Sequence, residues 1–154
     1  MVIRKTTVGS VENAAKLKEI IVALVSNLNS TKYKTELIKL CFILDYNYCK
    51  KFNLKKGPTT VEYIKYNYGP YSNSFVEAIE SLKEEGILVE TGLAFGAGYA
   101  LAKKENIELD PSVVEAIKEV ITEYGERTLR EMKNYIYNLP EFLRTDFGEP
   151  IQFN

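Results

Sequence analysis

The sequence predicts a mainly helical α+β fold, specifically a winged-helix-like domain with a C-terminal helical extension. Apolar residues repeat at helical spacing in several long segments, which predicts helices. Two short apolar segments in the middle of the chain flank a run of glycines, which predicts one β-hairpin. The resulting order of elements, two helices, a short element, a helix, a hairpin and further helices, is that of a winged helix. The 154 residues are expected to form a single domain, 1–154, with its core at about 11–106 and its helical extension at about 110–140.

The first two helices supply most of the expected core. The first is predicted from about Val11 to Leu28 and the second from about Lys34 to Phe52. The second is apolar on most of its sides, as is typical of a helix at the centre of a core. Its cysteines, Cys41 and Cys49, lie too far apart along the helix for a disulfide, so both are expected to be buried thiols.

The next segment, residues 59–68, is rich in β-branched and aromatic residues, and both a short strand and a short helix fit its pattern. Gly69-Pro70 is expected to break this segment. The third helix is predicted over about Phe75–Glu85. A capping box in Ser74-Phe-Val-Glu77 is expected to start it, and Gly86 is expected to end it.

The hairpin is predicted from strands at Ile87–Thr91 and Tyr99–Ala102. The glycine-bearing segment Gly92–Gly98 is expected to be a flexible tip, from which Phe95 can contact a partner. It lacks the Gly-Lys-Ser/Thr ending of a phosphate-binding loop, so no nucleotide is expected there.

Two more helices are predicted in the C-terminal extension. Asp110-Pro111 has the residues of an N-cap and a first helical position. Thr128-Leu-Arg-Glu131 is a capping box for the last helix, which Pro140 is expected to end.

The composition argues against an enzyme. The chain has no histidine, the commonest general base and metal ligand, and two distant cysteines do not make a zinc site. No catalytic residue, metal or cofactor is therefore expected. No apolar run is long enough to span a bilayer, and Met1–Lys5 lacks the features of a signal peptide. A cytoplasmic protein without a membrane partner is expected.

The net charge of −1 hides a division along the chain. Residues 1–66 contain 12 Lys and Arg against 5 Asp and Glu, a balance of +7, whereas residues 67–154 contain 8 against 16, a balance of −8. Two interpretations stay open. Either one half faces a charged partner, or the two halves interleave in the fold and neutralise each other.

A DNA-binding transcriptional regulator is the alternative function. The helix before the hairpin of a winged helix is the usual DNA reader, but here its outward residues include Glu77, Glu80 and Glu84, which would repel phosphates. Lysines of the N-terminal half suit a nucleic-acid backbone, an acidic protein or plain solvent equally well. They are Lys32, Lys34, Lys50, Lys51, Lys55, Lys56 and Lys65.

A tyrosine cluster next to a Gly-Pro turn favours a binding module. Four tyrosines fall within the nine residues from Tyr63 to Tyr71, and tyrosine is enriched at binding hot spots. The alternative is that Tyr63, Tyr66 and Tyr68 fill the edge of the core. The predicted partner-binding residues are Tyr63, Lys65, Tyr66, Tyr68, Gly69, Pro70 and Tyr71.

Asp45 is the one carboxylate on the apolar side of the second helix, and a buried carboxylate needs hydrogen-bond partners. Tyrosine hydroxyls, Lys65 or backbone amides near Gly69 are the expected donors. We interpret Asp45 as a structural anchor that fixes the Tyr-Gly-Pro turn to the helix. A role as a binding or catalytic acid stays open.

Two blocks, Lys34–Tyr48 and Glu62–Val76, carry a family resemblance. Together they resemble the Panacea antitoxin-like domain family, which has an apolar helix followed by an aromatic segment with the triplet Tyr-Gly-Pro. The resemblance covers about residues 15–140. It implies a small non-enzymatic domain of mobile genetic elements and toxin–antitoxin operons, which neutralises a toxin by direct binding. A cognate toxin is therefore the expected partner, with nucleic acid and a second copy of the chain left open.

Overall fold

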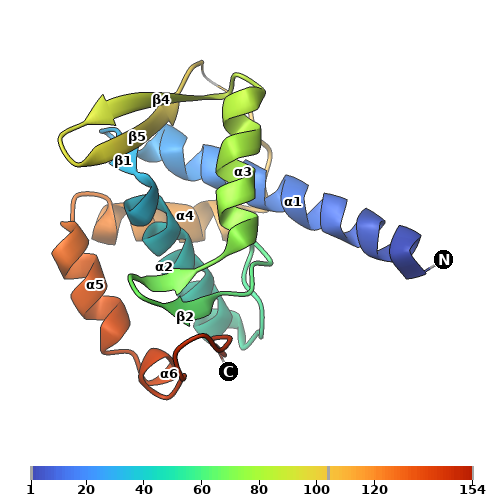
Figure 1. Ribbon diagram of the computed structural model, residues 1–154, viewed down its shortest axis with the longest axis vertical. Coiled ribbons are helices and arrows are strands. Elements are labelled where there is room, and N and C mark those ends of the chain that lie inside the picture. Colours follow the sequence, from blue (N-terminus) through green and yellow to red (C-terminus); the bar gives the residue numbers. More distant parts are fainter. Residues whose placement is uncertain (1, 104, 154) are drawn as a thin grey trace.

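A computed structural model describes residues 2–103 and 105–153, with residues 2–10 described as backbone only. The chain is mainly helical with two small antiparallel sheets, so the predicted α+β class is confirmed (Figure 1). The helices are α1 (Val2–Asn27), α2 (Lys34–Phe52), α3 (Asn73–Glu84), α4 (Pro111–Tyr124), α5 (Leu129–Tyr137) and α6 (Pro140–Leu143). The strands are β1 (Lys32–Tyr33), β2 (Ile64–Tyr66), β3 (Gly69–Tyr71), β4 (Leu88–Leu93) and β5 (Gly96–Leu101).

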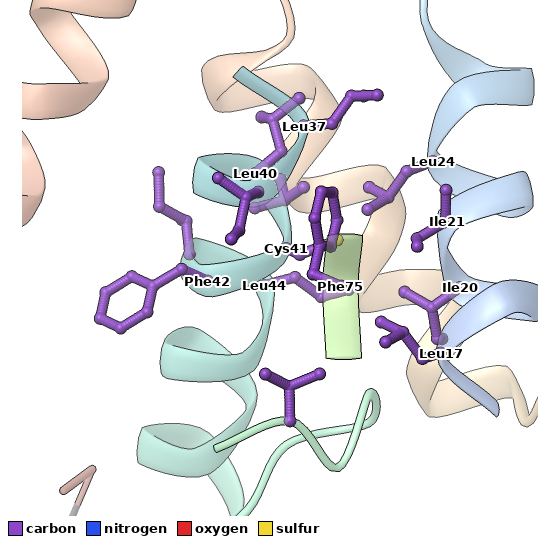
Figure 2. Close-up of a cluster of buried hydrophobic side chains, with 14 of the residues drawn as sticks. Leu17, Ile20, Ile21, Leu24, Leu37, Leu40, Cys41, Phe42, Leu44 and Phe75 are labelled. Carbon is purple, nitrogen blue, oxygen red and sulfur yellow. The ribbon is translucent and has the colours of Figure 1, made fainter. Parts of the chain in front are cut away.

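The core forms where α1, α2 and α3 meet. Apolar side chains of α1 face those of α2, and Phe75 of α3 lies between them (Figure 2). On another side of α2, Phe42 packs against Tyr63 and Phe153, with ring centroids 5.1 and 5.5 Å away. Helix α2 is thus central, as its apolar sequence predicts, and its bounds are those expected.

Two sheets lie at opposite ends of α3 (Figure 1). At one end, the strand order is β1-β5-β4, and β4 and β5 form a hairpin that pairs Leu88 with Leu101. At the other end, β2 and β3 form a short hairpin that pairs Ile64 with Tyr71. Because α3 follows β3 directly and precedes β4, it fixes the separation between the two hairpins.

Residues 59–68 and the Gly-Pro pair differ from expectation in an informative way. The segment contains a short strand, β2, and Gly69-Pro70 does not break the structure but forms the returning strand β3. Tyr66 pairs with Gly69, so only Asn67 and Tyr68 form the turn. The proline is tolerated because this is a two-stranded sheet, in which one edge of each strand needs no partner.

Three details of the sequence interpretation are wrong. Ser72, not Ser74, caps α3, because Ser72 has the extended backbone of an N-cap and its hydroxyl accepts from the Phe75 amide. Most of Gly92–Gly98 lies within β4 and β5, which leaves Ala94 and Phe95 as the tip. Pro140 starts α6 because proline suits the first helical position.

The two oppositely charged halves interleave. Three ion pairs join them, which supports mutual neutralisation: Lys18 with Glu85 at 2.6 Å, Lys51 with Glu119 at 3.9 Å, and Lys50 with Glu141. Within the described part of the chain, no helix has the length and apolar character needed to cross a bilayer. The same residues contain no group of three or more acidic, cysteine or histidine side chains placed to hold a metal ion.

Candidate partner-binding surface

The β2–β3 hairpin presents tyrosines to solvent, and α6 together with the C-terminal tail (residues 144–153) extends the exposed patch. The Tyr66 ring lies between those of Tyr71 and Phe147, with centroids 5.4 and 5.5 Å away. The Tyr68 side chain is 75% exposed, and those of Leu143 and Phe147 are 63% and 60% exposed. We call Tyr66, Tyr68, Tyr71, Leu143 and Phe147 the aromatic surface.

The tail is held against β2 by backbone hydrogen bonds. The Lys65 amide donates to the Glu149 carbonyl at 3.0 Å, the Gly148 amide to the Lys65 carbonyl at 2.7 Å, and the Ile151 amide to the Tyr63 carbonyl at 2.8 Å. The C-terminus accordingly lies beside β2 (Figure 1). Buried Glu141, which accepts from the Tyr46 hydroxyl and pairs with Lys50, fixes the start of this segment.

The tail residues are the part of the surface that the sequence interpretation missed. Their signal is the spacing of Phe147, Ile151 and Phe153 near the end of the chain. Ile151 and Phe153 are buried, whereas Phe147 is left on the surface. A groove of about 400 Å³ lies between hairpin and tail. It is lined by Lys65, Tyr66, Asn67, Tyr137, Phe142, Leu143 and Phe147.

The structure divides the predicted partner-binding residues by exposure. Tyr66 and Tyr68 are exposed, and Lys65 and Tyr71 are half-buried. Lys65 is held in place, because its ammonium donates to the Phe142 carbonyl at 3.0 Å and lies over the Phe142 ring. Tyr63, Gly69 and Pro70 are buried, so they can only support the surface from behind.

Asp45 is fully buried and accepts hydrogen bonds from the segment that leads into β2. The Thr59 amide donates to it at 3.1 Å and the Tyr63 hydroxyl at 2.7 Å, and the Thr59 hydroxyl donates as well. Of the expected donors, a tyrosine hydroxyl is therefore confirmed, whereas Lys65 and the amides near Gly69 are not among the partners. Asp45 therefore fixes the approach to the hairpin rather than its turn.

The loop beneath Asp45 is tightly constrained. A Cβ on Gly57 would lie 2.3 Å from the Asp45 Oδ1 atom, so only glycine fits there. Thr60 has φ of 62°, an unfavourable conformation for a β-branched residue. The three hydrogen bonds to Asp45 help hold this loop in that conformation.

We expect the free energy of unfolding to depend on pH because of Asp45. Burial raises its pKa from 3.8 to about 6, although the hydrogen bonds from Thr59 and Tyr63 oppose the shift. The folded state therefore binds more protons than the unfolded state between these values, and the contribution of Asp45 to the free energy of unfolding falls as pH rises from 4 to 6. About 2 kcal/mol of this contribution is lost between pH 4 and pH 6, out of about 3 kcal/mol over the whole titration.

Urea unfolding of the wild type and of Asp45→Asn at several pH values isolates the contribution of Asp45 to the free energy of unfolding, since the other titrating groups are common to both proteins. The free energy of unfolding of the wild type, relative to that of Asp45→Asn, should fall as pH rises from 4 to 6. A constant difference would contradict the assignment.

Gly69 holds the turn against the body of the protein and should not tolerate a side chain. Its φ is 106°, and a Cβ would lie 3.0 Å from the Lys39 ammonium and 3.3 Å from the Tyr137 ring. We expect Gly69→Ala to lower the free energy of unfolding by about 2 kcal/mol because backbone strain and crowding add. Gly92→Ala is the matched control, since its Cβ would meet nothing within 4 Å. Equal thermal stabilities of the two variants would contradict the prediction.

A second cleft, of about 480 Å³, lies between α1, α3 and the 56–62 loop. Its charged residues are balanced in sign, two lysines and two glutamates: Lys18, Lys56, Glu62 and Glu77. It offers no field of one sign and no exposed aromatic rings, so we place the candidate surface at the β2–β3 hairpin.

Comparison with known proteins identifies a family for most of the chain. The model of the family described as "Antitoxin SocA-like, Panacea domain" matches residues 37–141, more than half of the chain. That range includes α2 from Leu37 onward, both hairpins, α3, α4 and α5. No curated protein and no solved structure matches.

Proposed function

The chain belongs to the antitoxin SocA-like, Panacea domain family, and from this premise we propose that it is an antitoxin that binds its cognate toxin directly through the aromatic surface. The proposed mechanism is occlusion. The hairpin turn and the tail cover a functional face of the toxin, and no covalent step is needed. Family members are expected in toxin–antitoxin operons on mobile elements, which we propose for this chain as well, with its site of action in the cytoplasm.

The observation that carries the proposal is the exposure of adjoining aromatic and apolar side chains on an ordered hairpin. Tyr66 and Phe147 stack at 5.5 Å, yet both remain exposed, by 46% and 60%. Exposed apolar patches of this kind mark interaction sites, and tyrosine supplies large contact area at low entropic cost. Because the hairpin is fixed by Asp45 and by the tail, little ordering entropy remains to be lost on binding.

A binding role is favoured over a catalytic one. The chain lacks histidine, and the buried carboxylate of Asp45 is occupied by hydrogen bonds from the scaffold. A catalytic acid needs access to substrate, whereas Asp45 has an exposed fraction of 0%.

We further propose a winged-helix-like arrangement for α1, β1, α2, α3, β4 and β5, supported by the strand order β1-β5-β4. In this arrangement α3 would be the DNA reader. Its exposed Glu77 and Glu84 disfavour phosphate contacts, so we place protein binding ahead of DNA binding.

Co-expression tests the function. The genes flanking this one should include a product that arrests growth when expressed alone, and co-expression of this chain should restore growth and yield a stoichiometric complex. Recovery of promoter DNA instead, with an affinity that falls steeply with salt, would favour the regulator. Failure to restore growth with every flanking gene would overturn the antitoxin proposal.

A further inference from the structure

A buried lysine beneath the hairpin turn lacks an acidic partner. The exposed fraction of Lys39 is 2%, and its ammonium donates one hydrogen bond, to the Tyr68 carbonyl. Among the side chains that the structure describes, no carboxylate pairs with it. An ammonium has three donors, and burying it without a counter-charge is costly. A buried lysine without an acidic partner is uncommon in a core unless it has a function.

A second cation lies beside the first. Lys133 of α5 is exposed, and its ammonium is 5.4 Å from the centroid of the Tyr137 ring. Burial, and then repulsion by Lys133, lower the pKa of Lys39 to about 8. The groups that face Lys39 are the Tyr68 carbonyl and Gly69 from the hairpin, and Lys133 and Tyr137 from α5. Lys39 and Lys133 therefore bring two positive charges together behind this turn.

The lysine pair adjoins the aromatic surface. Tyr137, which contacts Gly69 and carries Lys133 over its ring, also lines the groove between hairpin and tail. The acceptor of the Lys39 hydrogen bond is the backbone of Tyr68, whose side chain is 75% exposed. A molecule that covers the aromatic surface therefore also covers the positive charge of the pair.

We propose that the partner places an aspartate or glutamate side chain against the Tyr66–Gly69 turn, where it pairs with Lys133 and is stabilised by the buried charge of Lys39. The proposal rests on the antitoxin function and specifies the chemistry of the toxin surface: an acidic residue flanked by apolar ones. The uncompensated charge of Lys39 is a cost in the free protein, which the nearby carboxylate reduces in the complex.

A protein carboxylate fits this site better than a nucleic-acid backbone. Phosphate binding uses rows of exposed cations, whereas here one lysine is exposed, one is buried, and Lys65 is already bound to the Phe142 carbonyl. Adjoining aromatic and charged anchors are instead typical of protein hot spots.

Selection from a random-peptide phage library on the immobilised full chain tests the proposal without knowledge of the toxin. The wild type should enrich peptides that combine acidic and apolar residues. A representative synthetic peptide should bind about ten-fold more weakly to Lys39→Met and to Lys133→Met. The matched control is Lys118→Met, an exposed lysine on α4, which should bind as the wild type does.

The stability of Lys39→Met separates binding from folding. Methionine has a similar length and no charge, so thermal unfolding should show a variant at least as stable as the wild type. Peptides without acidic enrichment, no enrichment at all, or binding that Lys39→Met and Lys133→Met leave unchanged would overturn the proposal. If acidic peptides are enriched but no flanking gene encodes a toxin, only the proposed antitoxin function is contradicted. If a toxin is found and binds Lys39→Met and Lys133→Met as it binds the wild type, only the proposed acidic contact is contradicted.

Discussion

Replacing Tyr66 and Tyr71 together by alanine is expected to abolish toxin binding while the protein stays folded. The two rings contact each other at 5.4 Å, and Tyr66 also stacks on Phe147, so the double substitution removes the centre of the aromatic surface. Hot-spot tyrosines contribute about 2 kcal/mol each on truncation, and adjoining ones are not additive. We expect a loss of about 3 kcal/mol, which is more than about 100-fold in Kd.

The measurement is a titration of the purified toxin, with growth rescue as the readout in cells. Phe95→Ala is the matched control. Phe95 is 91% exposed at the tip of the β4–β5 hairpin, at the opposite end of α3, and only its backbone amide is bonded, to the Tyr33 hydroxyl. The Phe95→Ala variant should bind the toxin as the wild type does. A folded Tyr66/Tyr71 double variant that still neutralises the toxin would contradict the assignment of the surface.

The sequence was most informative where local pattern and tertiary environment agree. The bounds of α2 follow from its apolar sequence because this helix is buried on most sides. The Thr128 capping box forms as predicted, with the Thr128 hydroxyl accepting from the Glu131 amide at 3.1 Å. In both cases the residues that determine the structure are neighbours along the chain.

Prediction failed where distant segments decide the outcome. Whether a tyrosine of the cluster is buried depends on the tail: Tyr63 lies beneath Phe153, whereas Tyr66 stacks on exposed Phe147. Nothing within residues 63–71 specifies that the tail pairs with β2. A tyrosine donor to Asp45 was expected and is found in Tyr63, but Thr59 was unforeseen, because the turn at Gly57 that brings it to the carboxylate is a feature of tertiary packing.

The dependence of the hairpin on distant segments explains how buried residues can determine the shape of a binding surface. Three buried positions fix the hairpin: Asp45 at its approach, Gly69 at its turn, and Glu141 at the start of the tail. The exposed fractions of Asp45 and Glu141 are 0% and 4%. Substitutions at these positions should impair binding only through loss of folded protein.

Asp45→Ala should be the most destabilising of these substitutions. It leaves the Thr59 amide and the Tyr63 hydroxyl without acceptors in the core and opens a cavity beneath a loop that contains the strained Thr60. Each unsatisfied buried donor costs about 1–3 kcal/mol. Removal of a buried charge offsets part of this, so we expect the free energy of unfolding to fall by about 3 kcal/mol, measured by urea unfolding.

Asp45→Asn distinguishes an anchor from a functional acid. The amide has the same shape and keeps an acceptor oxygen, so an anchor should lose less stability than in Asp45→Ala and should retain toxin binding in proportion to the folded fraction. If Asp45 acted as an acid toward a ligand, Asp45→Asn would stay folded and lose its function, as the Tyr66/Tyr71 variant is expected to do. Since Asp45 is fully buried beneath the loop that it orders, we expect the first outcome, with loss of binding tracking loss of fold.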